Sequence, residues 1–60
     1  MKPEEKRAEK KQAIIFAVQR VLAAEGYEGV TMKRVASEAG ISQGLLHYYF
    51  KDKEEMMVET

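Results

Sequence analysis

The chain has sixty residues, which is enough for one small domain and too few for an enclosed active site, since a chain of this length buries only about 60% of its unfolded surface. Its ten basic and ten acidic side chains cancel, so strong overall attraction to a polyanion is excluded. It has no cysteine, which excludes disulfides and thiolate metal sites.

A long amphipathic helix is predicted from about Glu5 to Glu25. Its apolar stripe, at helical spacing, consists of Ile14, Ala17, Val18, Val21 and Leu22. Gly26 is expected to end this helix, because glycine readily adopts the backbone conformations found after a helix C-terminus. Tyr27 and Val30 are expected to anchor the following link against the core.

Two short helices are predicted next, from Met32 to Ala39 and from Gln43 to Tyr49. Gly40 should terminate the first of them in the left-handed conformation, and Ser42 should cap the start of the second. The inward face of the second should consist of Leu46, Tyr49 and Phe50. Its outward face carries Gln43, Gly44, Leu45, His47 and Tyr48, a set suited to base edges, thymine methyl groups and phosphates.

A further helix is expected to begin just after Lys51. Asp52 and Glu55 stand three residues apart, the spacing of a capping box. The predicted fold is therefore all-α, with three homeodomain-like helices, a helix-turn-helix at about residues 31–50, and the start of a fourth helix. The predicted core comprises Ile14, Val18, Val21, Leu22, Val35, Ala36, Ile41, Leu46 and Phe50.

Phe16 does not fit this core, because at about 100° per residue it points away from the stripe through Ile14 and Val18. One explanation is a single exposed apolar side chain, which is common on protein surfaces. The other is that Phe16 packs against something outside these sixty residues. The apolar residues Met56, Met57 and Val58 favour the second explanation, because their pattern stops before a full turn is complete.

Positive charge is concentrated in two segments despite the zero total. Residues 1–12 hold five basic and three acidic side chains, and residues 31–53 hold four basic and two acidic ones, so each segment carries +2. The balancing acids Glu54, Glu55 and Glu59 lie near the C-terminal end. Positive charge is thus present in the helix-turn-helix segment, although its field is weak and non-specific affinity for DNA should be modest.

In its order of motifs, the sequence resembles the DNA-binding domain of the tetracycline-repressor (TetR) family of bacterial transcriptional regulators. The resemblance extends from Ile14 to Met57. It rests on residues 25–27 (EGY), Thr31, the pair Val35 and Ala36, residues 39–42 (AGIS), Gly44, Leu46, the pair Tyr49 and Phe50, and residues 51–55 (KDKEE). Each motif alone is weak, but the ordered set is specific.

The resemblance implies sequence-specific binding of double-stranded DNA by a homodimer at a palindromic operator, most often as a repressor. The helix Gln43 to Tyr49 would enter the major groove, where Gln43 would bond to a base. Matching positions imply DNA contact by Thr31, Lys33, Ser42, Gln43, Gly44, Leu45, His47, Tyr48, Tyr49 and Lys53. Phosphate contact is implied for Thr31, Tyr49 and Lys53, and close approach or methyl contact for Gly44 and Leu45.

The sequence departs from the family in two respects. His47 stands where the family most often has a tyrosine that contacts DNA, so this contact could become pH-sensitive or shift to Tyr48. The C-terminal domain that binds a small-molecule effector and forms the dimer in the family is absent from these sixty residues, so the chain is expected to be monomeric.

Alternatives remain open for several of these residues. Lys33 and Arg34 could form an ordinary solvated face, Tyr49 could be a core residue with its hydroxyl at the surface, and the N-terminal basic run could be a solvated helix or a frayed arm. The whole domain could also be a helical protein-interaction module without DNA binding.

No catalytic or cofactor site is expected. His47 has no second metal ligand or activated nucleophile at a usable spacing, so neither an enzyme nor a metal site is predicted. The methionines at helical spacing are expected in the core or an interface. The apolar runs are too short to span a bilayer and no signal-peptide pattern is present, so the expected compartment is the cytoplasm.

Overall fold

The computed structural model describes the backbone of residues 3–60 and the side chains of residues 9–60. In this part of the chain it contains α1 (Pro3–Glu25), a 3-10 turn η1 (Tyr27–Gly29), α2 (Met32–Ala39), α3 (Gln43–Tyr49) and α4 (Lys53–Glu59). The all-α prediction is confirmed, with α1 beginning two residues earlier than expected and η1 unforeseen. The side chains of Lys2, Lys6 and Arg7, part of the predicted basic run, lie outside the described residues.

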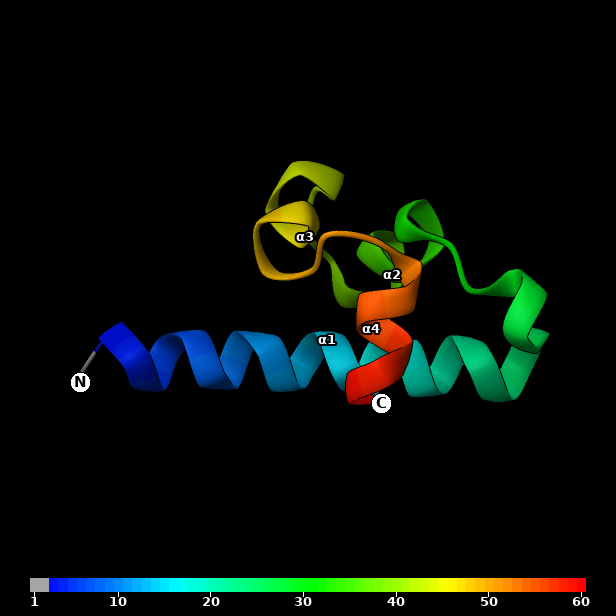
Figure 1. Cartoon of the computed structure of the whole chain (residues 1–60), viewed down its shortest axis with the longest axis horizontal. Coiled ribbons are helices and arrows are strands. Elements are labelled where there is room, and N and C mark those ends of the chain that lie inside the picture. Colours follow the sequence, from blue (N-terminus) through cyan, green and yellow to red (C-terminus); the bar gives the residue numbers. More distant parts are fainter. Residues whose placement is uncertain (1–2) are drawn as a thin grey trace.

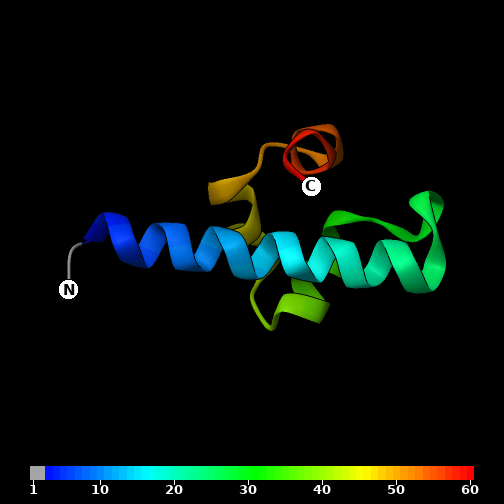
Figure 2. The ribbon, with the colours of Figure 1, turned by 90° about the horizontal axis from the view of Figure 1, so that it is seen from below.

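In Figure 1, α2 and α3 lie above α1, and α4 crosses in front of it. In the view turned by 90°, α2 and α4 lie on opposite sides of the α1 axis (Figure 2). The first turns of α1 extend beyond the other helices, consistent with principal extents of 36 × 20 × 19 Å. No helix in the described part of the chain is long and apolar enough to cross a membrane.

One continuous core holds these helices together. Its buried side chains come from every α-helix and from the link before α2: Ile14, Ile15, Ala17, Val18, Val21, Val30, Val35, Ala36, Leu46, Phe50 and Met56. Helices as short as α2, α3 and α4 are unstable in isolation, so this shared burial is what maintains them.

The structure corrects the predicted core at several positions, including Ile15, which is buried although it was not predicted. Leu22 and Ile41 are only partly buried, at the edge of the cluster. Met56, expected in the core or an interface, is fully buried in the core, whereas Val58 is 84% exposed. The ring of Tyr27, expected as an anchor, is 54% exposed, and Val30 alone anchors the link. Within α4, Met56 is buried and Val58 exposed because the helix turns only one of its faces toward the core.

The predicted helix ends are confirmed. Gly26 has φ 77° after α1, and Gly40 has φ 73° after α2, both in the region that favours glycine. The amide of Ile41 donates to the Ala36 carbonyl at 2.9 Å, closing the C-terminus of α2. The Asp52 carboxylate accepts from the Glu55 amide at 3.0 Å, so Asp52 caps α4 as predicted.

Candidate nucleic-acid interface

The outward face of α3 is a continuous row of exposed residues. Leu46 and the adjoining Phe50 are fully buried and secure the inward face of the helix. The outward face presents the residues predicted for it, all exposed: Gln43, Gly44, Leu45, His47 and Tyr48. The face therefore offers amide, imidazole, phenol and aliphatic groups on a helix whose orientation is fixed by the core.

The N-terminus of α3 is capped by Ser42, as predicted. Its Oγ accepts a hydrogen bond from the Leu45 amide at 3.0 Å. This bond satisfies one of the free N–H groups of the first turn and positions Gln43 and Gly44 at the exposed start of the helix. The Ser42 hydroxyl, one of the implied DNA contacts, is thus already engaged as an acceptor and keeps its proton to donate.

The C-terminal half of α3 carries the aromatic residues. The rings of Tyr48 and Tyr49 meet edge to face, with centroids 5.2 Å apart and planes at 89°. Tyr49 is half-buried, as expected for a residue shared between core and surface. Nδ1 of His47 lies 3.2 Å from the Lys51 carbonyl oxygen, which joins the last turn of α3 to the loop before α4.

Gly44 occupies a position where the protein itself has room for a side chain. A Cβ atom there would meet only the Ser42 Oγ, at 3.9 Å, an ordinary contact distance. At Gly29, by contrast, a Cβ would lie 2.4 Å from the Glu25 Cβ, so packing within the chain excludes a larger residue. Gly44 does not have a positive φ either. Neither backbone conformation nor packing among the described residues explains a glycine in this helix.

Thr31 and Lys33 lie at the start of α2. The Thr31 Oγ1 accepts from the Arg34 amide at 3.0 Å, so Thr31 is the N-cap of α2, a role the sequence analysis missed. The Thr-x-x-Arg segment offered a signal, because threonine directly before a helical pattern is a favoured cap. Lys33 is exposed in the first turn, and both residues flank the positive end of the α2 dipole.

Lys53, predicted to contact phosphate, links the start of α4 to η1 through Tyr27. Its Nζ donates to the Tyr27 carbonyl oxygen at 2.6 Å and lies 3.8 Å from the centroid of the Tyr27 ring. The exposed Tyr27 ring therefore has a partner, although not the core partner that was predicted. This contact places the Lys53 ammonium beside the segment that leads into α2.

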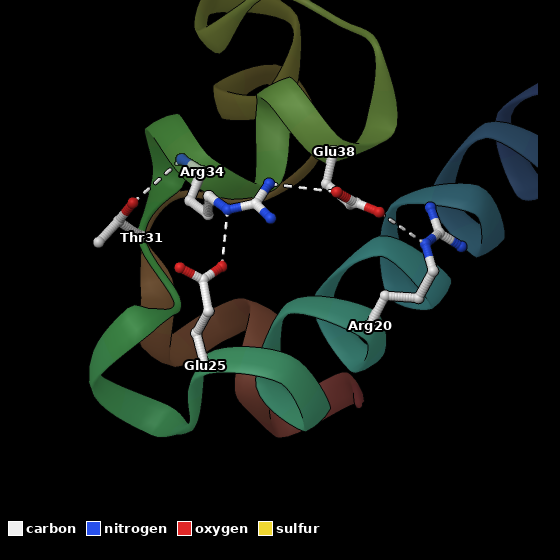
Figure 3. Close-up of polar contacts among 5 residues, drawn as sticks. All are labelled: Arg20, Glu25, Thr31, Arg34 and Glu38. Carbon is white, nitrogen blue, oxygen red and sulfur yellow. Dashed lines mark hydrogen bonds and ion pairs between the residues drawn. The ribbon is translucent and has the colours of Figure 1, made fainter.

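Arg34 belongs to an ion-pair network instead of a free basic face (Figure 3). Its guanidinium lies 2.7 Å from a Glu25 carboxylate oxygen and 3.1 Å from Glu38, while Arg20 lies 2.9 Å from the other oxygen of Glu38. Hydrogen bonds from Arg20 and then Arg34 lower the pKa of Glu38. Hydrogen bonds to Glu25 and Glu38 raise the pKa of Arg34. The network joins the C-terminal half of α1 to α2.

The ten predicted contact residues thus lie on three elements. Six follow one another on or next to α3, from Ser42 to Tyr48 without the buried Leu46, and Tyr49 is half-buried beside them. Thr31 and Lys33 lie at the start of α2, and Lys53 at the start of α4. Of the two basic candidates on α2, Lys33 is exposed, whereas Arg34 is engaged with carboxylates of α1 and α2.

Known proteins similar to this chain are transcriptional regulators. HTH-type transcriptional regulator BetI of Rhizobium meliloti is 37% identical over 51 residues, which are 85% of this chain and 25% of the relative. HTH-type transcriptional repressor AcnR of Corynebacterium diphtheriae is 35% identical over 49 residues, which are 82% of this chain and 26% of the repressor. This chain spans about a quarter of the length of these curated relatives.

A solved structure matches as well. The fatty acid degradation regulator FadR from Bacillus halodurans superimposes with a TM-score of 0.80 at 32% identity, covering 83% of this chain and 26% of that one. The family model for bacterial regulatory proteins of the tetR family matches residues 11–60, which include all of α2, α3 and α4. The chain therefore belongs to the tetR family of bacterial regulatory proteins.

Proposed function

We propose that this chain is the operator-reading module of a bacterial transcriptional regulator and that it binds double-stranded DNA through the outward face of α3. The observation that carries the proposal is the exposed row from Gln43 to Tyr48 on a helix anchored by buried Leu46 and Phe50. A major groove about 12 Å wide admits an α-helix presented in this way.

Each residue of the row has a chemistry suited to DNA. The Gln43 amide can bond to adenine N6 and N7 together, and Leu45 can contact a thymine methyl group. Ser42 and Tyr48 bring hydroxyl groups to the two ends of the row. These groups would supply base recognition and backbone contacts from a single helix.

Phosphate contacts are proposed for residues around α3. Thr31 and Lys33 lie at the N-terminus of α2, where free N–H groups favour an anion. Tyr49 has a hydroxyl at the end of α3. The Lys53 ammonium donates one hydrogen bond to the Tyr27 carbonyl oxygen, and because an ammonium has three N–H donors it can also bind a phosphate oxygen. Such contacts would position the duplex without specifying its sequence.

Gly44 supports close approach of α3 to DNA. Glycine in a helix costs about 0.5–1 kcal/mol relative to alanine. No packing among the described residues requires glycine at position 44. A partner that comes within contact distance of the helix backbone would account for it.

Gly44→Ala tests the proposal, because stability and DNA binding should change in opposite directions. Thermal or urea unfolding should show a gain of about 0.5–1 kcal/mol. Binding to the operator obtained by selection from a random oligonucleotide pool should weaken at least about fivefold, which corresponds to about 1 kcal/mol.

Gln19→Ala, an exposed substitution on α1, is the matched control and should leave DNA binding unchanged. Undiminished operator binding by Gly44→Ala would contradict the proposed docking. A chain that showed no salt-dependent binding to random duplex DNA at low salt would instead be a protein-interaction module.

The remaining proposals concern the longer protein. The relatives are about four times as long as the matched region, and the family resemblance implies that the additional part forms a homodimer. We propose accordingly that two copies bind a palindromic operator, as a repressor, and that they act in the bacterial cytoplasm, where the chromosome lies. Two-fold symmetry of the protein requires a matching symmetry of the DNA site.

A further inference from the structure

His47 makes a contact that fixes the hydrogen-bonding character of its ring. Nδ1 lies 3.2 Å from the backbone carbonyl oxygen of Lys51, four residues further along the chain. A carbonyl oxygen can only accept, so Nδ1 must be the donor in this hydrogen bond. The neutral imidazole has one proton, and this hydrogen bond favours the tautomer that carries it on Nδ1.

The other ring nitrogen, Nε2, is consequently left with a lone pair. His47 is exposed on the outward face of α3, in the row that begins at Gln43. A neutral His47 can therefore offer a hydrogen-bond acceptor there and no N–H donor at Nε2. When the ring gains a proton, Nδ1 remains bonded to the Lys51 carbonyl and Nε2 becomes a donor. Protonation thus changes Nε2 from a hydrogen-bond acceptor into a hydrogen-bond donor.

We propose that His47 is a specificity-determining residue whose preferred base depends on its protonation state. The neutral ring would accept from an exocyclic amino group, adenine N6 or cytosine N4. The protonated ring would donate to a carbonyl oxygen, guanine O6 or thymine O4. The inference rests on the proposed docking of α3 in the major groove, and it identifies His47 as the residue whose base preference changes with pH.

Charged groups stand on the loop after α3 and on each of the other α-helices. Lys51 and Asp52 belong to the loop that follows it, and Asp52 is engaged as the cap of α4. From α1, the Nζ of Lys11 lies 5.5 Å from the centroid of the Phe50 ring and is paired with Glu59 of α4. On α2, Arg34 and Glu38 pair with α1, and Lys33 is exposed.

The ring assignment can be measured on the chain without DNA. Long-range proton–nitrogen correlation spectra at pH 8 should show the proton of His47 on Nδ1 and a lone pair on Nε2. His47 is the only histidine in the sequence, so its signals need no further assignment. A proton predominantly on Nε2 would overturn the inference.

Selection from a random duplex pool at pH 8 and at pH 5.5 tests which base His47 prefers at each pH. At one base position, the wild-type chain should prefer an amino base at pH 8 and a carbonyl base at pH 5.5. The expected change is about two- to tenfold in relative affinity, the effect of a single hydrogen bond. Elsewhere in the selected site the preferences should agree at the two pH values.

His47→Gln is the matched control, because the glutamine amide can donate or accept and does not titrate in this range. It should bind DNA with the same preference at both pH values. A reversal that persisted in His47→Gln, or identical wild-type preferences at both pH values, would overturn the inference.

Gln43→Ala separates this inference from the docking on which it rests. If Gln43→Ala relaxes specificity while His47 shows no pH effect, the docking stands and only the inference about His47 fails. If neither substitution alters specificity, the docking of α3 itself is wrong, and the inference fails with it.

Discussion

At the scale of single residues, Leu45 and Leu46 are neighbours on α3 with opposite environments. Leu46 is fully buried in the core, whereas Leu45 is 36% exposed on the outward face. Truncation of a buried leucine removes apolar contacts and leaves a cavity, so Leu46→Ala should cost about 2–4 kcal/mol of unfolding free energy. In a sixty-residue domain that loss is a large part of the total.

Leu45→Ala provides the matched comparison, since it removes the same atoms from the same helix. It should change the unfolding free energy by no more than about 0.5 kcal/mol, because surface substitutions usually have small effects. Circular-dichroism melts of the two variants distinguish the buried role of Leu46 from the exposed position of Leu45. Equal losses would mean that α3 is not oriented by Leu46.

At the scale of elements, the ion pairs between α1 and α2 make their packing sensitive to pH. Arg20 and Arg34 hold the pKa of Glu38 below its ordinary value of 4.5. A carboxyl with a lowered folded-state pKa contributes stability that is present above its unfolded pKa and is lost as the pH falls through the folded value. The contribution of Glu38 should therefore be complete above about pH 5 and disappear at lower pH.

Unfolding measured from pH 6 to pH 3 tests this expectation. Wild type should be more stable than Glu38→Gln at pH 6, and the difference should shrink progressively below pH 4.5. Glu28→Gln, which alters an exposed carboxyl of η1, should remain parallel to wild type over this range. A constant difference between wild type and Glu38→Gln would show that the two arginines do not stabilise the ionised carboxylate.

At the scale of the whole molecule, the large exposed apolar side chains of the described residues belong to several elements. Phe16 on α1 is 50% exposed, as its helical angle predicted, and Val58 at the end of α4 is 84% exposed. Tyr27 lies on η1, and Leu45 and Tyr48 belong to the proposed DNA face. Single exposed apolar residues are ordinary on monomer surfaces.

We therefore expect these sixty residues alone to be monomeric at micromolar concentration. Sedimentation equilibrium should return a mass near 6.9 kDa. In the longer protein that we propose, two linked modules should bind a palindrome much more tightly than one module binds a half-site, because linkage raises the effective concentration. A stable dimer of the sixty residues would place an interface on the surface described above and contradict this expectation.

The sequence by itself determined the four α-helices and most of their ends, because helix ends depend on neighbours within a few residues, although the start of α1 and the turn η1 were not predicted. Gly40 and Ser42 define the turn between α2 and α3 through local backbone preferences and a hydrogen bond to an amide three residues away. The spacing of apolar residues likewise assigned Leu46 and Phe50 to the core and the row from Gln43 to Tyr48 to the surface.

Only the tertiary structure decided which distant residues meet. Lys53 contacts Tyr27 across 26 positions, and Arg20 contacts Glu38 across 18. Met56 is buried in the core, where its local pattern left core and interface both open. These outcomes follow from the angles at which α2 and α4 cross α1, and helix crossing is set by the packing of side chains from several elements together. Local propensities contain no information about such crossings.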